Sequence, residues 1–350
     1  MKPKIRMAVI GAGAFGASHI RVLSGMADVE LVAVVDLDLA KAKKLANGHG
    51  SSAFASLDQL PAEIDAAIVA TPTVTHETVA ESLLGSGIDV LIEKPIADSA
   101  EAGERLTRLA TENGRILQVG HLERFNPAVV ELRRLVTIPL FFEVHRLSVF
   151  TPRSLDVDVV LDLMIHDLDI VLRLTSERPK EIRAAGISVL SPKVDIANVR
   201  LSFASGCVAN LTASRISTEQ VRKLRLFQPG EYLSVDYKRQ DLTKVRVLPN
   251  ELVLPNELSL TSSPGSKTLA DPVLPNEREN GFVFSKVPVA NAEPLALELA
   301  AFVEAVRKRS NPKVGGAEAT EALRLAEEIL ATIKVHAQTV SETIRRRGKH

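Results

Sequence analysis

The chain has 350 residues, of which 45% are hydrophobic and 25% charged, a composition typical of soluble globular proteins and long enough for two domains. Its 43 basic and 43 acidic side chains balance without a long basic block, which argues against nucleic acid or an anionic membrane as a main partner. The single cysteine excludes a disulfide framework and a cysteine-rich metal site. No apolar stretch approaches the ~20 residues of a membrane span, and the basic start reaches a glycine too early for a signal peptide. We therefore expect a cytoplasmic protein.

Short apolar runs alternate with amphipathic segments over the first 120 residues. The expected strands are Ile5–Ile10, Glu30–Asp36, Asp65–Thr71, Asp89–Glu93 and Arg115–Val119. Helices are expected between them, for example over Val74–Leu84 and Ser99–Thr111. Strands separated by helices indicate βαβ units and a parallel sheet. We predict a nucleotide-binding domain over residues 1–122.

The pattern changes after residue 122, where helices over Glu123–Val136 and Asp156–Leu174 flank one expected strand, Phe141–Phe150. Four long strands then follow with little helix between them: Glu181–Leu190, Val194–Phe203, Cys207–Ile216 and Val221–Gln228. Consecutive strands of this length favour an antiparallel sheet in a second domain of α+β type, over residues 123–350.

The second domain ends in a turn-rich region and two helices. Residues 248–277 contain Leu-Pro-Asn-Glu three times at unequal spacing, which indicates turns in an exposed connection and no solenoid repeat. Helices are expected over Pro294–Arg309 and Ala317–Gln338, packed back on the first domain.

The run Gly11-Ala-Gly13-Ala14-Phe15-Gly16 follows the first expected strand and opens a helix. In a dinucleotide-binding loop the first glycine permits a tight turn, the second admits a pyrophosphate and the third lets helix and strand pack closely. Free N–H groups at the helix start also favour phosphate. The motif alone is weak, but its strand–turn–helix context is the one that dinucleotide binding requires. The alternative is a plain turn.

Asp36 ends the next expected strand, about 20 residues after the last glycine of the loop. A carboxylate there accepts hydrogen bonds from the adenosine ribose and repels a 2′-phosphate, so the sequence predicts NAD rather than NADP. The alternative is that Asp36 caps a helix over Leu39–Leu45.

Glu93, Lys94 and Pro95 form a charged end to the apolar strand Asp89–Glu93. Buried charges need partners, and ligands of doubly wound sheets bind beyond the carboxyl ends of the strands. Pro95 also keeps Lys94 out of the α-helical region of backbone space. Lys94 is therefore the first candidate for chemistry. The alternative is a surface lysine whose stem lies on apolar surface.

The helix expected around Val159–Leu174 is mostly apolar, and Asp162, His166, Asp169 and Arg173 share one stripe along it. Since Asp162 lies one turn from His166, we expect the carboxylate to orient the imidazole and raise its basicity. No further histidine or cysteine lies at ligand spacing, so no metal is expected. The alternative is a solvated stripe or a core histidine.

Together these motifs resemble the Gfo/Idh/MocA oxidoreductase family, which includes glucose–fructose oxidoreductase and inositol dehydrogenase. The matching segments are Gly11-x-Gly-x-x-Gly16, Ala70-Thr-Pro-Thr-x-x-His76, Glu93-Lys-Pro95, Asp162-x-x-x-His166-x-x-Asp169, and Glu293-Pro-Leu followed by Glu298-Leu and Phe302. The resemblance covers nearly the whole chain. It implies an α/β N-terminal Rossmann fold with a parallel sheet, and a C-terminal α+β domain with a large, mostly antiparallel open sheet. Members often associate through that sheet, which implies a homodimer or homotetramer.

The resemblance also implies roles for individual residues. The family's catalytic lysine corresponds to Lys94, and its aspartate and histidine correspond to Asp162 and His166. Glu93 is expected to anchor the corner or to touch the nicotinamide ribose. The residues expected to contact NAD are Gly11, Gly13, Ala14, Phe15, Gly16, Asp36, Thr71, Pro72, His76, Glu93 and Lys94.

A narrower similarity comes from the segment QVGHLERFNPA at residues 118–128, which resembles the UDP-N-acetylglucosamine 3-dehydrogenases. These enzymes oxidise the C3 hydroxyl to a ketone, which an aminotransferase converts to an amino sugar for lipid A or surface polysaccharide. The residues expected to bind this nucleotide sugar are His121, Arg124, Asn126, Asp162 and His166. An arginine fork suits a diphosphate, although the first three residues would also suit a capped helix N-terminus.

We therefore expect hydride transfer from C3 of a UDP-linked N-acetylhexosamine to NAD, with His166 as base. Lys94 would hydrogen-bond the reacting oxygen and stabilise its negative charge, and the roles of Lys94 and His166 are exchangeable. Three other interpretations stay open: a dehydrogenase of a free sugar or inositol, an NAD-binding sensor without turnover, and a reductase of a linear tetrapyrrole. The aromatic content of 4% is low for the last of these.

Overall fold

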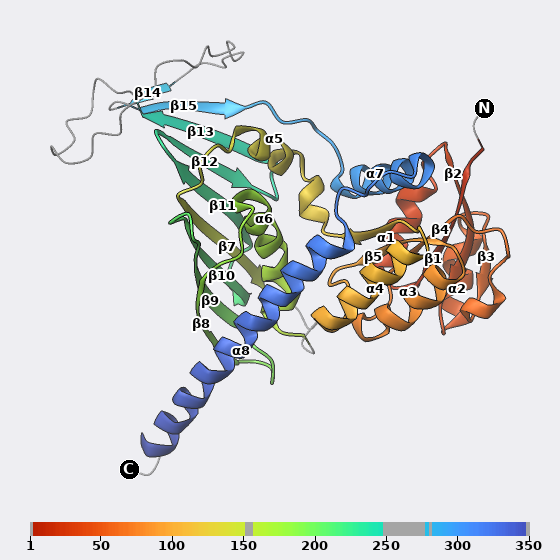
Figure 1. Ribbon diagram of the computed structural model, residues 1–350, viewed down its shortest axis with the longest axis horizontal. Coiled ribbons are helices and arrows are strands. Elements are labelled where there is room, and N and C mark those ends of the chain that lie inside the picture. Colours follow the sequence, from red (N-terminus) through yellow and green to blue (C-terminus); the bar gives the residue numbers. More distant parts are fainter. Residues whose placement is uncertain (1–2, 151–156, 248–276, 280–281, 348–350) are drawn as a thin grey trace.

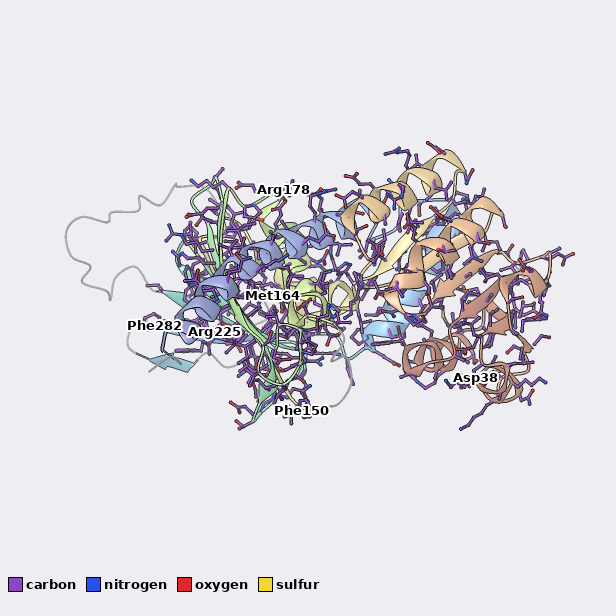
Figure 2. All side chains as sticks on the ribbon, turned by 90° about the horizontal axis from the view of Figure 1, so that it is seen from below. Asp38, Phe150, Met164, Arg178, Arg225 and Phe282 are labelled. Atoms are coloured by element: carbon purple, nitrogen blue, oxygen red, sulfur yellow. The ribbon has the colours of Figure 1, made fainter. Side chains whose placement is uncertain are left out.

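The computed structural model describes residues 3–150, 157–247, 277–279 and 282–347. Nearly all of the turn-rich region 248–277 and the expected helix start at Asp156 lie outside the described residues. The two domains lie side by side along the long axis of the molecule (Figure 1). Figure 2 shows Asp38 in the first domain and Phe282 in the second towards opposite ends of this axis.

The first domain contains a six-stranded sheet in the order β3-β2-β1-β4-β5-β6, and all of its strand pairs are parallel. Its strands are β1 (Ile5–Ile10), β2 (Val29–Val35), β3 (Ser52–Phe54), β4 (Ala66–Val69), β5 (Asp89–Glu93) and β6 (Leu117–Gly120). The predicted Rossmann fold is confirmed.

Helices cover both faces of this sheet, because successive side chains of its nearly all-apolar strands point to opposite sides. Met7 and Val9 of β1 pack with α1 (Ala14–Leu23), α2 (Leu39–Asn47) and α7 (Pro294–Lys308). Ala8 and Ile10 face α3 (His76–Gly85), α4 (Ala100–Glu112) and the first turns of α8 (Gly316–Arg347). The chain therefore returns from the second domain to complete the core of the first.

The second domain contains a nine-stranded sheet in the order β14-β15-β13-β12-β11-β7-β10-β9-β8 (Figure 1). Only the β7–β10 pair is parallel, so the predicted large, mostly antiparallel sheet is confirmed. The strands are β7 (Phe141–Val149), β8 (Glu181–Ile187), β9 (Ile196–Ser202), β10 (Val208–Ser217), β11 (Val221–Gln228), β12 (Glu231–Asp236), β13 (Asp241–Val247), β14 (Glu277–Glu279) and β15 (Phe282–Val287).

One face of this sheet is covered and the other is open. Buried and half-buried side chains alternate along β7, and the buried ones, such as Phe142 and Val144, pack with α5 (Pro127–Leu135), α6 (Ile165–Thr175) and α8. Among the described helices, none is long and apolar enough to cross a membrane.

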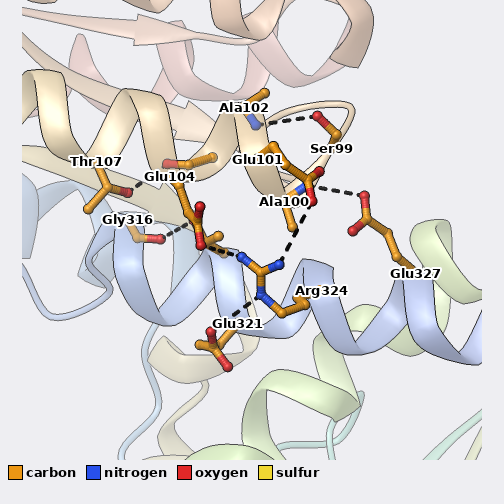
Figure 3. A network of polar contacts seen from close by, with 12 residues as sticks. Ser99, Ala100, Glu101, Ala102, Glu104, Thr107, Gly316, Glu321, Arg324 and Glu327 are labelled. Carbon is orange, nitrogen blue, oxygen red and sulfur yellow. Dashed lines mark hydrogen bonds and ion pairs between the residues drawn. The ribbon is translucent and has the colours of Figure 1, made fainter.

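Helix α8 links the domains, since it contacts α4 of the first domain and α6 and β8 of the second. Arg324 of α8 pairs with Glu101 and Glu104 of α4, and Glu327 accepts the backbone N–H of Ala100 at 3.1 Å (Figure 3). These contacts place the carboxyl ends of the parallel strands against the covered face of the second sheet.

The helix predicted over Asp156–Leu174 is not uniform. Val160–Met164 is a π-helical segment, and the regular α-helix α6 begins only at Ile165. A π-turn inserts an extra residue and is frequent at functional sites. It lies at the end of the helix that faces Lys94.

Candidate active site

The glycine loop between β1 and α1 combines two glycines required by the backbone with one that borders open space. Gly11 has φ +104°, and a Cβ there would clash with the carbonyl oxygen of Ala70. A Cβ on Gly16 would clash with the carbonyl oxygen of Gly11, whereas one on Gly13 would meet no atom within 4 Å. Gly13 is the N-cap of α1, so free backbone N–H groups border this open space. The loop therefore fits a pyrophosphate.

A carboxylate beside the loop, that of Asp36, completes this fit. Asp36 accepts the N–H of Ala12 at 2.7 Å and the N–H of Asp38 at 2.8 Å, which fixes its carboxylate at the end of β2. The helix cap is Asp38, which accepts from Ala40 and Lys41, so the alternative assignment of Asp36 as cap is wrong. Ala14 and Phe15 are exposed at the start of α1. A fixed carboxylate suits a ribose diol and repels a 2′-phosphate.

Lys94 reaches from the end of β5 to the start of the second domain's helix. Its Nζ donates to the carbonyl oxygen of Asp162 at 2.7 Å and lies 3.4 Å from Oδ1 of the same residue. The Lys94 side chain is 12% exposed, and the Lys94–Pro95 peptide bond is cis. A cation held this way can point at a substrate oxygen in the space between the domains.

The structure corrects one expectation about His166. Asp162 contacts Lys94 rather than His166, and Nδ1 of His166 is buried without a hydrogen-bond partner. The pKa of His166 is lowered well below its ordinary value, by burial and then by the positive charge of Lys94 and other basic neighbours. The imidazole is therefore neutral near pH 7, ready to accept a proton, but it is less basic than the sequence suggested.

The other three residues expected at the substrate take different places. His121 is 1% exposed and lies edge-on to His166 with ring centroids 6.3 Å apart, and both of its ring nitrogens lack hydrogen-bond partners. Arg124 makes a bidentate pair with the buried Asp169 at 2.6 and 2.7 Å. Asn126 caps α5 by accepting the N–H of Ala128. Of the three, His121 is the one with a ring contact to the proposed base.

The residues expected on the nicotinamide side gather at the end of β4. His76 is buried, its ring nitrogens lie 2.9 Å from the carbonyl oxygens of Pro95 and Thr71, and its pKa is lowered mainly by burial. Thr71 accepts the hydroxyl of Thr75, and Pro72 is exposed. His76 thus braces the Lys94–Pro95 corner against β4.

Sequence reasoning gave no role to two neighbours of Glu93, a partner in His19 and a second carboxyl group in Glu298. His19 of α1 lies 2.7 Å from Glu93 Oε1, and its helical position relative to Gly16 places it on the buried side of α1. Glu298 of α7 is 1% exposed, and neither of its carboxyl oxygens has a hydrogen-bond partner. Burial and the nearby Glu93 raise the pKa of Glu298 well above its ordinary value. The amphipathic period of α1 could have placed His19, whereas Glu298 was part of a segment that matches the family but was given no role.

A buried ion cluster lies beneath His166 on the second sheet. Arg146 of β7 makes a bidentate pair with Asp167 at 2.6 and 2.9 Å, also contacts Glu123 at 3.0 Å, and lies over the ring of Tyr237. Together with Arg222 of β11, it adds positive charge that lowers the pKa of His166. Among the described residues, no group of histidine, cysteine and carboxylate side chains is placed to hold a metal ion.

Comparison with known proteins agrees with this arrangement. Residues 5–121 match the model of the oxidoreductase family with an NAD-binding Rossmann fold, and residues 140–227 match the Gfo/Idh/MocA C-terminal domain. The chain belongs to the Gfo/Idh/MocA oxidoreductase family. Within this family it is an NAD-binding dehydrogenase that acts on a hydroxyl group.

Relatives within the Gfo/Idh/MocA family include dehydrogenases of different substrates. A UDP-N-acetylglucosamine 3-dehydrogenase of Acidithiobacillus ferrooxidans is 39% identical over 239 residues, 68% of this chain and 76% of the relative. Its solved structure has a TM-score of 0.83 at 33% identity and covers 95% of this chain and 98% of its own. An inositol 2-dehydrogenase of Rhizobium meliloti is 29% identical over 231 residues, 61% of this chain and 70% of the relative.

Proposed function

We propose that this dehydrogenase uses NAD⁺ to oxidise the C3 hydroxyl of a UDP-N-acetylhexosamine to a ketone. The substrate that we propose is UDP-N-acetylglucosamine. The observation that carries the reaction type is the convergence of Lys94 and His166 at the carboxyl edge of the Rossmann sheet. The choice of substrate is supported by the 39% identical relative, which is named for this reaction.

Two residues of the chain, His166 and Lys94, have separate roles in the oxidation of the alcohol. The neutral imidazole of His166 accepts the hydroxyl proton at Nε2, because Nδ1 is buried. Lys94, held by Asp162, donates a hydrogen bond to the same oxygen and stabilises its developing negative charge. When bound, NAD⁺ supplies the hydride acceptor. The exchanged assignment, with Lys94 as base, uses the same geometry.

The direct test is NADH formation measured at fixed NAD⁺ with UDP-N-acetylglucosamine, UDP-N-acetylgalactosamine, free N-acetylglucosamine and myo-inositol. We expect the highest kcat/KM with UDP-N-acetylglucosamine, a 3-keto product by mass spectrometry and NMR, and lower kcat/KM with NADP⁺. Turnover of free N-acetylglucosamine as efficient as that of the nucleotide sugar would disprove the substrate assignment. Tighter binding of NADP⁺ than of NAD⁺ would remove the role given to Asp36.

The second candidate is an inositol or free-sugar dehydrogenase. It is supported by several inositol 2-dehydrogenases among the relatives, at 28–36% identity over about half of this chain or more. Efficient turnover of myo-inositol together with no response to any UDP-sugar would favour it.

We further propose that the 3-keto product is consumed by an aminotransferase in the cytoplasm, and that the amino sugar enters lipid A or surface polysaccharide. A ketone beside an acetamido group is a natural acceptor for transamination. The test is deletion of the gene followed by mass spectrometry of lipid A and polysaccharide. Unchanged 3-amino sugar content would refute the proposal that the product enters lipid A or surface polysaccharide.

We also propose a homodimer or homotetramer formed through the uncovered face of the nine-stranded sheet. This face carries an aromatic cluster, with ring centroids 6.0 Å apart for Phe141 and Phe227 and 4.9 Å apart for Phe227 and Tyr232. Phe227 is 39% exposed, although large apolar side chains favour burial. Native mass spectrometry of the wild type and of Phe227→Glu tests the assignment, since a wild-type monomer would contradict it.

A further inference from the structure

A large cavity lies away from the catalytic residues, among helices of both domains. Its volume is about 1180 Å³, and its walls come from α4, α5, α6, α7 and the segment that leads into α8. The glycine loop, Lys94, Asp162 and His166 are absent from its described lining. It also reaches Arg115 and Ile116, which precede β6, whereas Lys94 follows the carboxyl end of β5. The cavity is therefore separate from the proposed reaction centre.

The charged lining of this cavity is mostly basic. Its basic side chains are Arg115, Arg124, Arg133, Arg134, Arg173 and Lys313, and its acidic ones are Glu304 and Glu318. Three of the basic groups already have partners elsewhere: Arg124 binds Asp169, Arg134 binds Glu131, and Arg115 donates to backbone carbonyls. The other three are Arg133, Arg173 and Lys313.

The remaining basic groups lack matching negative charge. Arg173 lies 3.5 Å from Glu318, a carboxylate that it shares with Arg124, and its buried Nε has no hydrogen-bond partner. No described residue forms an ion pair with Arg133 or with Lys313, which lies 6.0 Å from the ring centroid of Phe125. Partial burial lowers the pKa of Arg133, the positive charges of Arg173 and Arg124 lower it further, and the nearby Glu318 opposes this shift. Arg133 and Lys313 thus contribute two positive charges that have no ion-pair partner among the described residues.

The rest of the wall is apolar. Its accessible part comes from Val130 of α5 and Leu297 of α7, which are 36% and 38% exposed, whereas Phe125, Val129 and Ile170 behind them are nearly fully buried. A cavity that joins apolar walls to a few convergent polar groups is the usual form of a small-molecule site. An inorganic ion would leave those walls without a partner.

We propose that this cavity is a second ligand site that binds a phosphate monoester with an apolar body. The phosphate lies among Arg133, Arg173 and Lys313, and the apolar part lies against Val130 and Leu297. A phosphate monoester carries a charge of about −1.5 to −2 at pH 7, which matches the uncompensated positive charge. Guanidinium forks suit phosphate oxygens through paired N–H donors.

The test is calorimetric titration of the full-length protein, saturated with NAD⁺, using n-hexyl phosphate, inorganic phosphate and hexanoate as probes. We expect one n-hexyl phosphate site per chain, with binding about tenfold or more tighter than that of either other probe. Equal affinity for inorganic phosphate would overturn the apolar part of the proposal. Equal affinity for hexanoate would overturn the phosphate assignment, and no binding at millimolar concentrations would overturn the site itself.

Variants localise the binding. Arg133→Gln and Arg173→Gln should each weaken n-hexyl phosphate about tenfold or more, which corresponds to about 1.4 kcal/mol or more. The matched control is Arg183→Gln, an exposed arginine of β8 that is paired with Glu181 and should leave affinity unchanged. Because Arg133 is exposed, its variant should fold normally, as a thermal melt would verify. Unchanged affinity in Arg133→Gln would place the ligand elsewhere.

Discussion

Lys94 Nζ donates a 2.7 Å hydrogen bond to the main-chain carbonyl oxygen of Asp162, which ties the end of β5 to the π-helical segment before α6. The two residues belong to different domains, so this contact aligns the cofactor-binding sheet with the helix that carries His166. A main-chain acceptor does not depend on the Asp162 side chain. A mutation of the Asp162 side chain can therefore remove the negative charge beside Lys94 and keep the main-chain hydrogen bond that positions Lys94.

Lys94→Met should lower kcat about 10²- to 10⁴-fold, because it removes the cation at the reacting oxygen. Asp162→Asn keeps the main-chain acceptor and should lower kcat only about tenfold. Steady-state kinetics with NAD⁺ binding measured by fluorescence titration checks both. Lys308→Met, at a 65% exposed lysine of α7, is the control. A kcat for Lys94→Met within tenfold of the wild type would exclude Lys94 from the chemistry.

The lowered pKa of His166 predicts the acidic side of the pH profile. A base works in its neutral form, so kcat/KM should fall only as the pH drops below the ordinary histidine pKa of about 6.5. Arg222→Gln removes one of the positive charges that lower this pKa, so the acidic limb should move to higher pH. The pH dependence of kcat/KM and NMR titration of the imidazole measure this shift. An acidic limb at the same pH in both proteins would show that another group titrates.

The glycine loop predicts opposite outcomes for two similar substitutions. Gly16→Ala places a methyl group against the carbonyl oxygen of Gly11 and should destabilise the fold by about 1–3 kcal/mol or more. Gly13→Ala points its methyl group into open space, so its melting temperature should stay near that of the wild type. Its NAD⁺ affinity should nevertheless fall about tenfold or more, because the methyl group occupies the place of the pyrophosphate. Melting curves and NAD⁺ titrations compare the two, and unchanged NAD⁺ affinity in Gly13→Ala would move the pyrophosphate off this glycine.

The sequence alone predicted the features that depend on local pattern. Strand Asp89–Glu93 was predicted with its observed bounds, because apolar runs and the following proline are local signals. Residues 231–236 and 241–247 were not assigned as strands, although they form β12 and β13. Their fully buried residues Leu233, Val235 and Leu242 are too few for a strong local signal, and pairing with β11 and β15 fixes these segments as strands.

The candidate site shows the same limit. The helical stripe correctly brought Asp162 and His166 to one helix, but the period of an ideal helix could not reveal the π-turn. Nor could it show that Lys94, 68 residues away in sequence, takes the Asp162 contact. Arg124 and Asn126 were predicted as substrate ligands from the similarity of residues 118–128 to nucleotide-sugar dehydrogenases and from their hydrogen-bonding side chains, and this prediction stays untested. Their partners Asp169 and Tyr237 lie in other elements of the fold. The sequence therefore could not show that Arg124 and Asn126 satisfy buried hydrogen-bonding groups of the protein itself.

Glu298 predicts how stability depends on pH. Its pKa is raised in the folded state, so folded and unfolded chains are both protonated below the ordinary glutamate pKa of about 4.3. Above that pH the Glu298 carboxyl ionises in the unfolded chain but stays protonated in the folded one. The free energy of unfolding therefore falls as the pH rises through the folded-state pKa. Glu298→Gln cannot ionise at this position and should lose this part of the slope. Its stability relative to the wild type should therefore increase from pH 4 to pH 8.

The control for Glu298→Gln lies on the same helix. Glu304 is exposed and paired with Lys308, which lowers its pKa, so Glu304→Gln should shift stability slightly in the opposite direction over the same pH range. Urea unfolding of the wild type and both variants at pH 4, 6 and 8 gives the three slopes. Because each comparison is between pH values within one variant, a constant loss from burying an amide cancels. Parallel slopes for Glu298→Gln and the wild type would mean that Glu298 ionises in the folded protein as readily as in the unfolded chain.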